Sequence, residues 1–120
     1  MLARSALVAL LFAAPVTAAA AASPSGAPGQ RASGQPAAAV QETDRLQFEP
    51  MSVRVARGDV VEWTNRGSIP HNVTFDRYPS LSSGTMNGGD TYEIRFTTPG
   101  TYPYRCTFHP GMDGTVTVSG

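Results

Sequence analysis

Short runs in which hydrophobic and polar residues alternate dominate the chain from about residue 45 onward. Each run stops at turn residues such as Pro50, Gly58-Asp59 or Pro99-Gly100, and no window keeps a helical period. The strands predicted from these runs cover residues 46–49, 52–56, 61–64, 71–75, 92–96, 102–106 and 116–118. Residues 76–89 break the pattern with several Ser and Gly residues, which predicts a loop with one short strand at most. Many short strands at this spacing predict an all-β fold, a small antiparallel β-sandwich with Greek-key connections.

The first 41 residues follow different patterns. Residues 1–22 combine a short positive start, an apolar run and small residues that fit a cleavage site, which predicts a signal peptide and export to the periplasm or the extracellular space. The strongly apolar part is too short to span a bilayer, so cleavage is favoured over a retained membrane tether, and no membrane span is expected in the mature form. Residues 23–41 are rich in Pro, Gly and Ala and predict a disordered linker. The folded domain is therefore expected at residues 42–120.

Charge and cysteine content narrow the classes of function. The 120 residues carry a formal net charge of zero, and all nine basic residues are arginine. From residue 42 onward there are seven arginines against nine acidic residues and no basic stripe, which argues against nucleic acid as a partner. The single cysteine, Cys106, excludes an internal disulfide, so its thiol is a buried group, a reactive group or a metal ligand.

The segment CTFHPGM at residues 106–112 is a C-x-x-H-x-x-M loop between two predicted strands. A thiolate, an imidazole and a thioether suit copper that moves between Cu(I) and Cu(II), with two His and one Cys in a plane and a distant axial Met. The only other histidine, His71, lies at a turn-to-strand junction that a sandwich can place beside this loop. The sequence therefore predicts one type 1 copper site made by His71, Cys106, His109 and Met112.

Other interpretations explain these residues less well. Taken singly, Cys106 and Met112 are more often core residues, and each histidine is more often an ordinary polar residue. An immunoglobulin-like sandwich would need a second cysteine, and structural zinc would need four strong N or S ligands where three are available. A Cys-His nucleophilic pair is conceivable, but no oxyanion-stabilising device is visible.

Four motifs resemble the cupredoxins, in particular plastocyanin-like and amicyanin-like members. They are GDVVEWTN (58–65), PHNV (70–73), PGTY (99–102) and CTFHPGM (106–112), and the resemblance covers residues 46–119. The two-residue gap between His109 and Met112 is the short form found in amicyanin. Pro103 departs from the family pattern and must occupy a position where no ladder donor is needed.

The resemblance implies a non-enzymatic blue copper protein that transfers single electrons between redox proteins outside the cytoplasm. It places Asn72 beside the ligands, with its backbone N–H toward the Cys106 sulfur and its side chain toward Thr107. It also implies a monomer in which the outer edge of His109 reaches solvent, where redox partners would dock transiently. Pro110, Ile69 and Met86 are the candidates for an apolar ring around that edge. An alternative function with the same ligands is copper binding or copper delivery, whereas a copper enzyme would need more centres than two histidines can supply.

Overall fold

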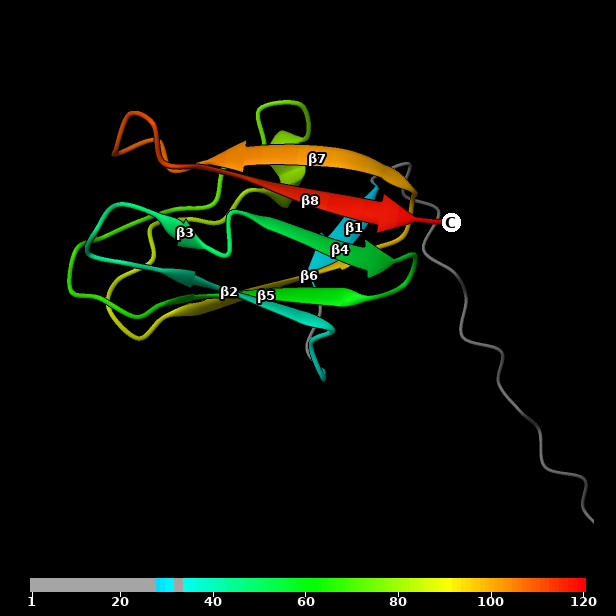
Figure 1. The fold of residues 1–120 in the computed structure, drawn as a ribbon, viewed down its shortest axis with the longest axis horizontal. Helices are drawn as coiled ribbons and strands as arrows, with labels where there is room; N and C mark the ends of the chain where they lie inside the picture. Colours follow the sequence, from blue (N-terminus) through cyan, green and yellow to red (C-terminus); the bar gives the residue numbers. More distant parts are fainter. Residues whose placement is uncertain (1–27, 32–33) are drawn as a thin grey trace, which may run out of the picture.

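Two β-sheets pack face to face in a computed structural model that describes residues 28–31 and 34–120 (Figure 1). One sheet has the strand order β1-β6-β5-β2-β3 and the other β4-β8-β7. The strands are β1 (Gly29–Arg31), β2 (Ala38–Glu42), β3 (Phe48–Glu49), β4 (Ser52–Ala56), β5 (Val60–Asn65), β6 (Thr91–Phe96), β7 (Gly100–Arg105) and β8 (Asp113–Ser119). A 3-10 turn, η1 (Pro79–Leu81), is the one helical element among the described residues. The predicted all-β sandwich is confirmed.

The core lies between the sheets, where the inward positions of the alternating runs meet. In β4, β6, β7 and β8 every second residue is buried, as the period of two requires. Aromatic rings fill the centre: Trp63 makes edge contacts with Phe75 and Tyr104 at centroid distances of 6.0 and 5.4 Å. Such packing contributes both buried area and edge-to-face contacts.

Both sheets are mixed, which corrects the prediction of an antiparallel sandwich. β2 runs parallel to β5 with Val40 opposite Trp63, and β4 runs parallel to β8 with Val53 opposite Val116. Hydrophobic alternation is the same for either strand direction, so the pattern could not distinguish them.

The predicted linker is wrong for the residues that the structure describes. β1 pairs with β6, and β2 lies between β5 and β3 in the larger sheet. The segment is ordered because it pairs with strands that are distant in sequence. This pairing buries Val40, which is 1% exposed, although its neighbours in sequence are small or polar. The predicted signal peptide at residues 1–22 lies outside the described residues. Among the described residues, none belongs to a helix long and apolar enough to cross a membrane.

Residues 71–75 do not form the predicted strand. They make isolated bridges instead, His71 with Met86 and Thr74 with Arg105. Val73 and Phe75 are nevertheless fully buried. Pro103 lies in β7, an edge strand, where a residue without an N–H is tolerated.

Candidate metal centre

Three soft or borderline donor atoms converge at the end of the sandwich where the loops after β5 and β7 meet, on the left of Figure 1. Cys106 Sγ lies 3.9 Å from His71 Nδ1 and 3.5 Å from His109 Nδ1, and the three donor atoms all lie within 4.8 Å of one another. Metal bonds of about 2.1 Å, opened by about 120° in a trigonal plane, place donor atoms about 3.6 Å apart. The two distances from the Cys106 sulfur are therefore close to those expected for a trigonal metal site.

The C-terminal loop supplies Cys106, His109 and Met112 as one closed unit. Cys106 N–H donates to the Met112 carbonyl at 2.9 Å, and Met112 N–H donates to the His109 carbonyl at 3.1 Å. Cys106 and Met112 are 2% and 1% exposed, whereas His109 is partly exposed. A thioether in this sheltered position suits a soft metal, and one ligand edge remains open to solvent.

His71 is fully buried, and its second ring nitrogen fixes its tautomer. Nε2 lies 3.0 Å from the Thr43 carbonyl, which can only accept, so Nε2 carries the proton. The lone pair of Nδ1 consequently faces Cys106. Burial lowers the pKa of His71 below its usual range, with the nearby His109 adding to the shift, so the ring is neutral at pH 7. A neutral imidazole with a free Nδ1 is the form that binds a metal.

Asn72 joins the two ligand loops through its side chain. Its Nδ2 donates to Thr107 Oγ1 at 2.7 Å, and its Oδ1 accepts from Thr107 N–H at 3.0 Å and from the Thr74 hydroxyl at 2.9 Å. The residue after His71 is thus bonded to the residue after Cys106, across 35 positions of sequence.

A scan against family models matches residues 35–119 to the copper binding proteins of the plastocyanin/azurin family. The chain belongs to this family. It is 38% identical to amicyanin-alpha of Methylorubrum extorquens over 78 residues, which are 62% of this chain and 66% of that protein. It is 38% identical to the amicyanin of Paracoccus denitrificans over 68% of this chain and 65% of that protein, so in both cases the match spans slightly less than two thirds of the relative. With the plastocyanin of Scenedesmus fuscus the identity is 36% over 64% of this chain and 91% of that protein.

Solved structures agree with this assignment. A structure of an oxidized amicyanin mutant superposes with a TM-score of 0.67 at 32% identity, over 76% of this chain and 98% of that chain. The reduced Cu(I) form of another amicyanin mutant gives a TM-score of 0.68 at 30% identity, over 77% of this chain and 99% of that chain. The predicted resemblance is thereby confirmed, and the relatives are plastocyanins and amicyanins rather than enzymes. Copper is the cofactor of this cupredoxin, and its type 1 site consists of His71, Cys106, His109 and Met112.

Sequence reasoning missed the residues that hold the loop leading to His71. Asn65, at the end of β5, is 1% exposed; its Nδ2 donates to the carbonyls of Ile69 and Met86 at 2.8 and 2.9 Å, and its Oδ1 accepts from Gly67 N–H at 3.0 Å. The sequence Asn-Arg-Gly signalled only a turn. Asn65 also binds the Met86 carbonyl, and local sequence patterns cannot show this contact because Met86 is 21 positions away.

The apolar ring predicted around the exposed edge of His109 differs from the structure at two residues, Met86 and Phe108. Met86 is 3% exposed and belongs to the core, so it cannot contribute to a surface ring. Phe108 is instead 48% exposed, and its ring stands edge-on to His109 at a centroid distance of 6.4 Å. Pro110 is exposed and Ile69 is partly exposed.

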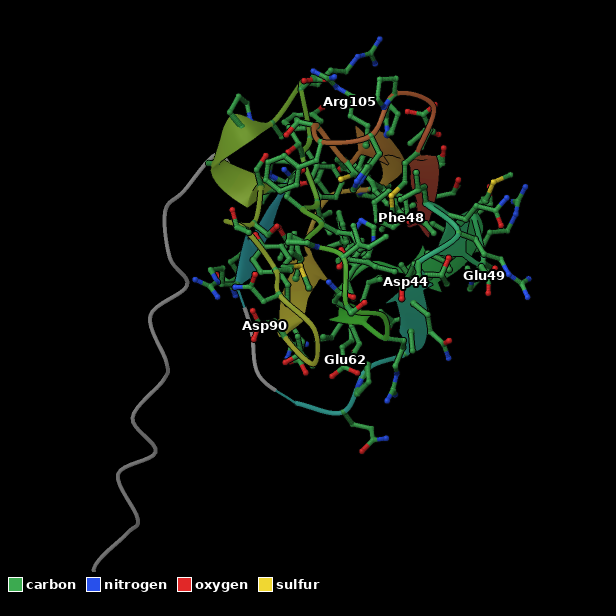
Figure 2. All side chains as sticks on the ribbon, turned by 90° about the vertical axis from the view of Figure 1, so that its left-hand side faces the viewer. Asp44, Phe48, Glu49, Glu62, Asp90 and Arg105 are labelled. Atoms are coloured by element: carbon green, nitrogen blue, oxygen red, sulfur yellow. The ribbon has the colours of Figure 1, made fainter. Side chains whose placement is uncertain are left out.

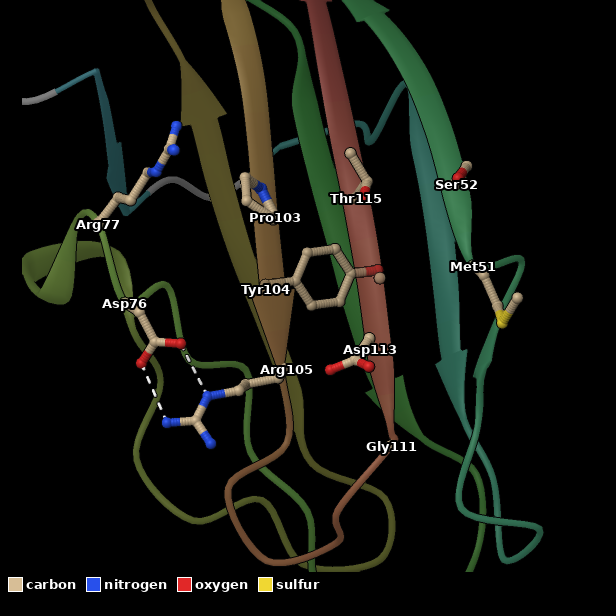
Figure 3. A pocket seen from close by; sticks show the side chains of 11 residues that line it. Met51, Ser52, Asp76, Arg77, Pro103, Tyr104, Arg105, Gly111, Asp113 and Thr115 are labelled. Atoms are coloured by element: carbon tan, nitrogen blue, oxygen red, sulfur yellow. Dashed lines mark hydrogen bonds and ion pairs between the residues drawn. The ribbon is translucent and has the colours of Figure 1, made fainter.

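A separate open groove of about 610 Å³ lies over β7 and β8 (Figure 3). Asp76 and Arg105 form an ion pair at its wall, with Arg105 Nε 2.7 Å from Asp76 Oδ2. None of the four copper ligands lines this groove, so we assign it no part in the metal chemistry.

Proposed function

We propose that this cupredoxin carries single electrons between redox proteins outside the cytoplasm, and that it performs no substrate chemistry. The observation that carries the proposal is the convergence of His71 Nδ1, Cys106 Sγ and His109 Nδ1 within 4.8 Å of one another, beside a loop that also contains the buried Met112. When bound, copper supplies a one-electron couple between Cu(I) and Cu(II). Three of the four side chains that would hold it are buried, which supports a carrier role over substrate chemistry.

Each ligand has a distinct role in this proposal. His71, Cys106 and His109 would supply the strong nitrogen and sulfur ligands, and Met112 would add a weak thioether. A rigid set of ligands lowers the cost of reorganisation when the charge changes. Two hydrogen bonds close the loop from Cys106 to Met112, and a third joins His71 Nε2 to the Thr43 carbonyl. These bonds restrict movement of the ligands.

Asn72 and Thr107 orient the ligands without binding the metal. Their reciprocal hydrogen bonds hold the two ligand loops in register, which supports this role. Neighbours of this kind fix ligand geometry and tune the metal's properties.

The partly exposed His109 is the proposed electron exit. The exposed ring of Phe108 stands beside it and Pro110 follows it in sequence, and this apolar surface suits a small, transient redox interface; Ile69 remains a candidate member of the same surface. We further propose that the chain is exported by residues 1–22 and acts as a monomer; the first part of this proposal rests on the sequence pattern alone.

The optical and electron-paramagnetic spectra of the copper-loaded protein test the proposed function. We expect an intense thiolate-to-copper absorption band and a narrow copper hyperfine splitting, both lost in Cys106→Ala. A colourless wild-type protein with wide hyperfine splitting would refute the type 1 assignment. Reversible voltammetry with slow metal loss to a chelator supports electron transfer, whereas rapid metal exchange with poor cycling would instead support copper delivery.

A further inference from the structure

The turn between β2 and β3 touches the loop that leads to His71 through a charged side chain. Asp44 Oδ1 accepts from the backbone N–H groups of Ser68 at 2.8 Å and Ile69 at 3.1 Å. Asp44 Oδ2 accepts from the Ser68 hydroxyl at 3.3 Å. These bonds join residues 24 and 25 positions apart, so they are tertiary contacts rather than local turn geometry.

Gly67 makes room for this carboxylate. A Cβ atom at Gly67 would overlap Asp44 Oδ1, and the adjacent carboxyl carbon as well. Gly67 has no positive φ, so conformational freedom does not explain the glycine. The close approach of the Asp44 side chain does.

The same turn also holds the imidazole of His71. The Thr43 carbonyl accepts from His71 Nε2 at 3.0 Å, and Thr43 is the residue before Asp44. The turn is itself closed by Thr43 N–H to the Gln47 carbonyl at 3.1 Å and by Leu46 N–H to the Thr43 carbonyl at 3.0 Å. Two consecutive residues of one closed turn therefore fix the ring of His71 and the backbone just before it.

We propose that Asp44 is a positioning residue for His71: its carboxylate fixes the backbone of the loop that presents this ligand. Asn65 holds the loop from the core, and Asp44 holds it from the solvent side, on the end of the sandwich that faces the viewer in Figure 2. Without the carboxylate, the loop can shift relative to the turn, and the bond between His71 Nε2 and the Thr43 carbonyl weakens. The inference rests on the proposed function only in taking His71 as a copper ligand.

The first measurement uses the metal-free protein. In Asp44→Ala, we expect the ring N–H proton of His71 to exchange with solvent about tenfold faster than in the wild type by nuclear magnetic resonance, because its acceptor is no longer held in place. In Asp44→Asn, the amide oxygen can still accept both backbone N–H groups. We therefore expect this conservative variant to restore exchange to within about twofold of the wild type.

The second measurement uses the copper-loaded protein. We expect Asp44→Ala to lose copper to a chelator about tenfold faster, the lower end of what neighbours of metal ligands contribute. The matched control is Asp59→Ala, which removes a carboxylate that accepts from Ala56 N–H at 2.8 Å in the turn before β5, at the opposite end of that strand. This control is expected to leave both readouts unchanged.

A second route to the same contact is Gly67→Ala, whose Cβ displaces the carboxylate. We expect it to speed His71 ring exchange and copper loss, as Asp44→Ala does. The double variant should be no faster than either single variant, because all three lose the same contact between the Asp44 carboxylate and the loop. If Asp44→Ala does not fold, Gly67→Ala alone decides the question.

Unchanged His71 ring exchange in both Asp44→Ala and Gly67→Ala would overturn the proposal, as would an equal change in Asp59→Ala. A wild type without the type 1 spectrum would refute the proposed function, while ring exchange in the metal-free variants would still test the contact itself.

Discussion

Glu42 is an ionisable residue inside the sandwich, and it makes stability depend on pH in a way that can be measured. It ends β2 with 0% exposure, opposite Phe48 of β3. Neither carboxylate oxygen has a hydrogen-bond partner among the described residues, and the same holds for Trp63 Nε1 and the Tyr104 hydroxyl. A buried carboxylate without partners is costly, so the neutral acid is favoured.

Burial raises the pKa of Glu42 from 4.5 to about 7. The folded protein therefore binds this proton more tightly than the unfolded chain does. The resulting stabilisation is fully present below pH 4.5 and is lost as the pH rises through about 7. The shift corresponds to about 3 kcal/mol in total, of which about 2.5 kcal/mol is lost between about pH 5 and about pH 8.

The assay is denaturant unfolding of the wild type and Glu42→Gln at these two pH values, in the same metal state. Glutamine has a similar size and cannot ionise, so the free energy of unfolding of the wild type should fall by about 2.5 kcal/mol more than that of the variant. Ligand protonation is common to both proteins and cancels. Glu49→Gln, on the exposed face of β3, is the matched control and should behave as the wild type. Parallel pH profiles for the wild type and Glu42→Gln would refute the reasoning.

Three further substitutions test the core, the anchor of the loop before His71 and an exposed ion pair. Phe75→Ala removes a fully buried ring that contacts Trp63 and Tyr104, so unfolding by denaturant should show a loss of about 3–5 kcal/mol; a loss below about 1 kcal/mol would contradict the assigned core. Asn65→Ala removes three side-chain hydrogen bonds to backbone groups of the following loop and of Met86, and we expect a loss of about 2–4 kcal/mol together with faster amide exchange in that loop; protected amides would argue against its anchoring role. Asp76→Asn breaks an exposed ion pair to Arg105 and should cost less than about 1 kcal/mol, an effect that should vanish in high salt; a larger, salt-independent loss would show that the pair does more than its exposure implies.

The residues of the site could be predicted because three of the four ligands lie in one heptapeptide. Cys106, His109 and Met112 are close in sequence, and their order and chemistry already indicate copper. His71 could be added because it is the only other histidine. Its tautomer and the bonds of its loop could not be predicted, since they depend on Thr43, Asp44 and Met86 from distant segments.

The sequence by itself determined the period of the strands and hence which side chains point inward. It also determined the donor set of the site, since both are properties of short segments. The tertiary structure decided what long-range pairing controls. In the folded protein a segment rich in small residues forms β2, β2 runs parallel to β5, and Glu42 is buried in the core. The physical reason is that a backbone ladder pairs with little regard to side chains, so strand direction and partner are set by which surfaces can be buried together.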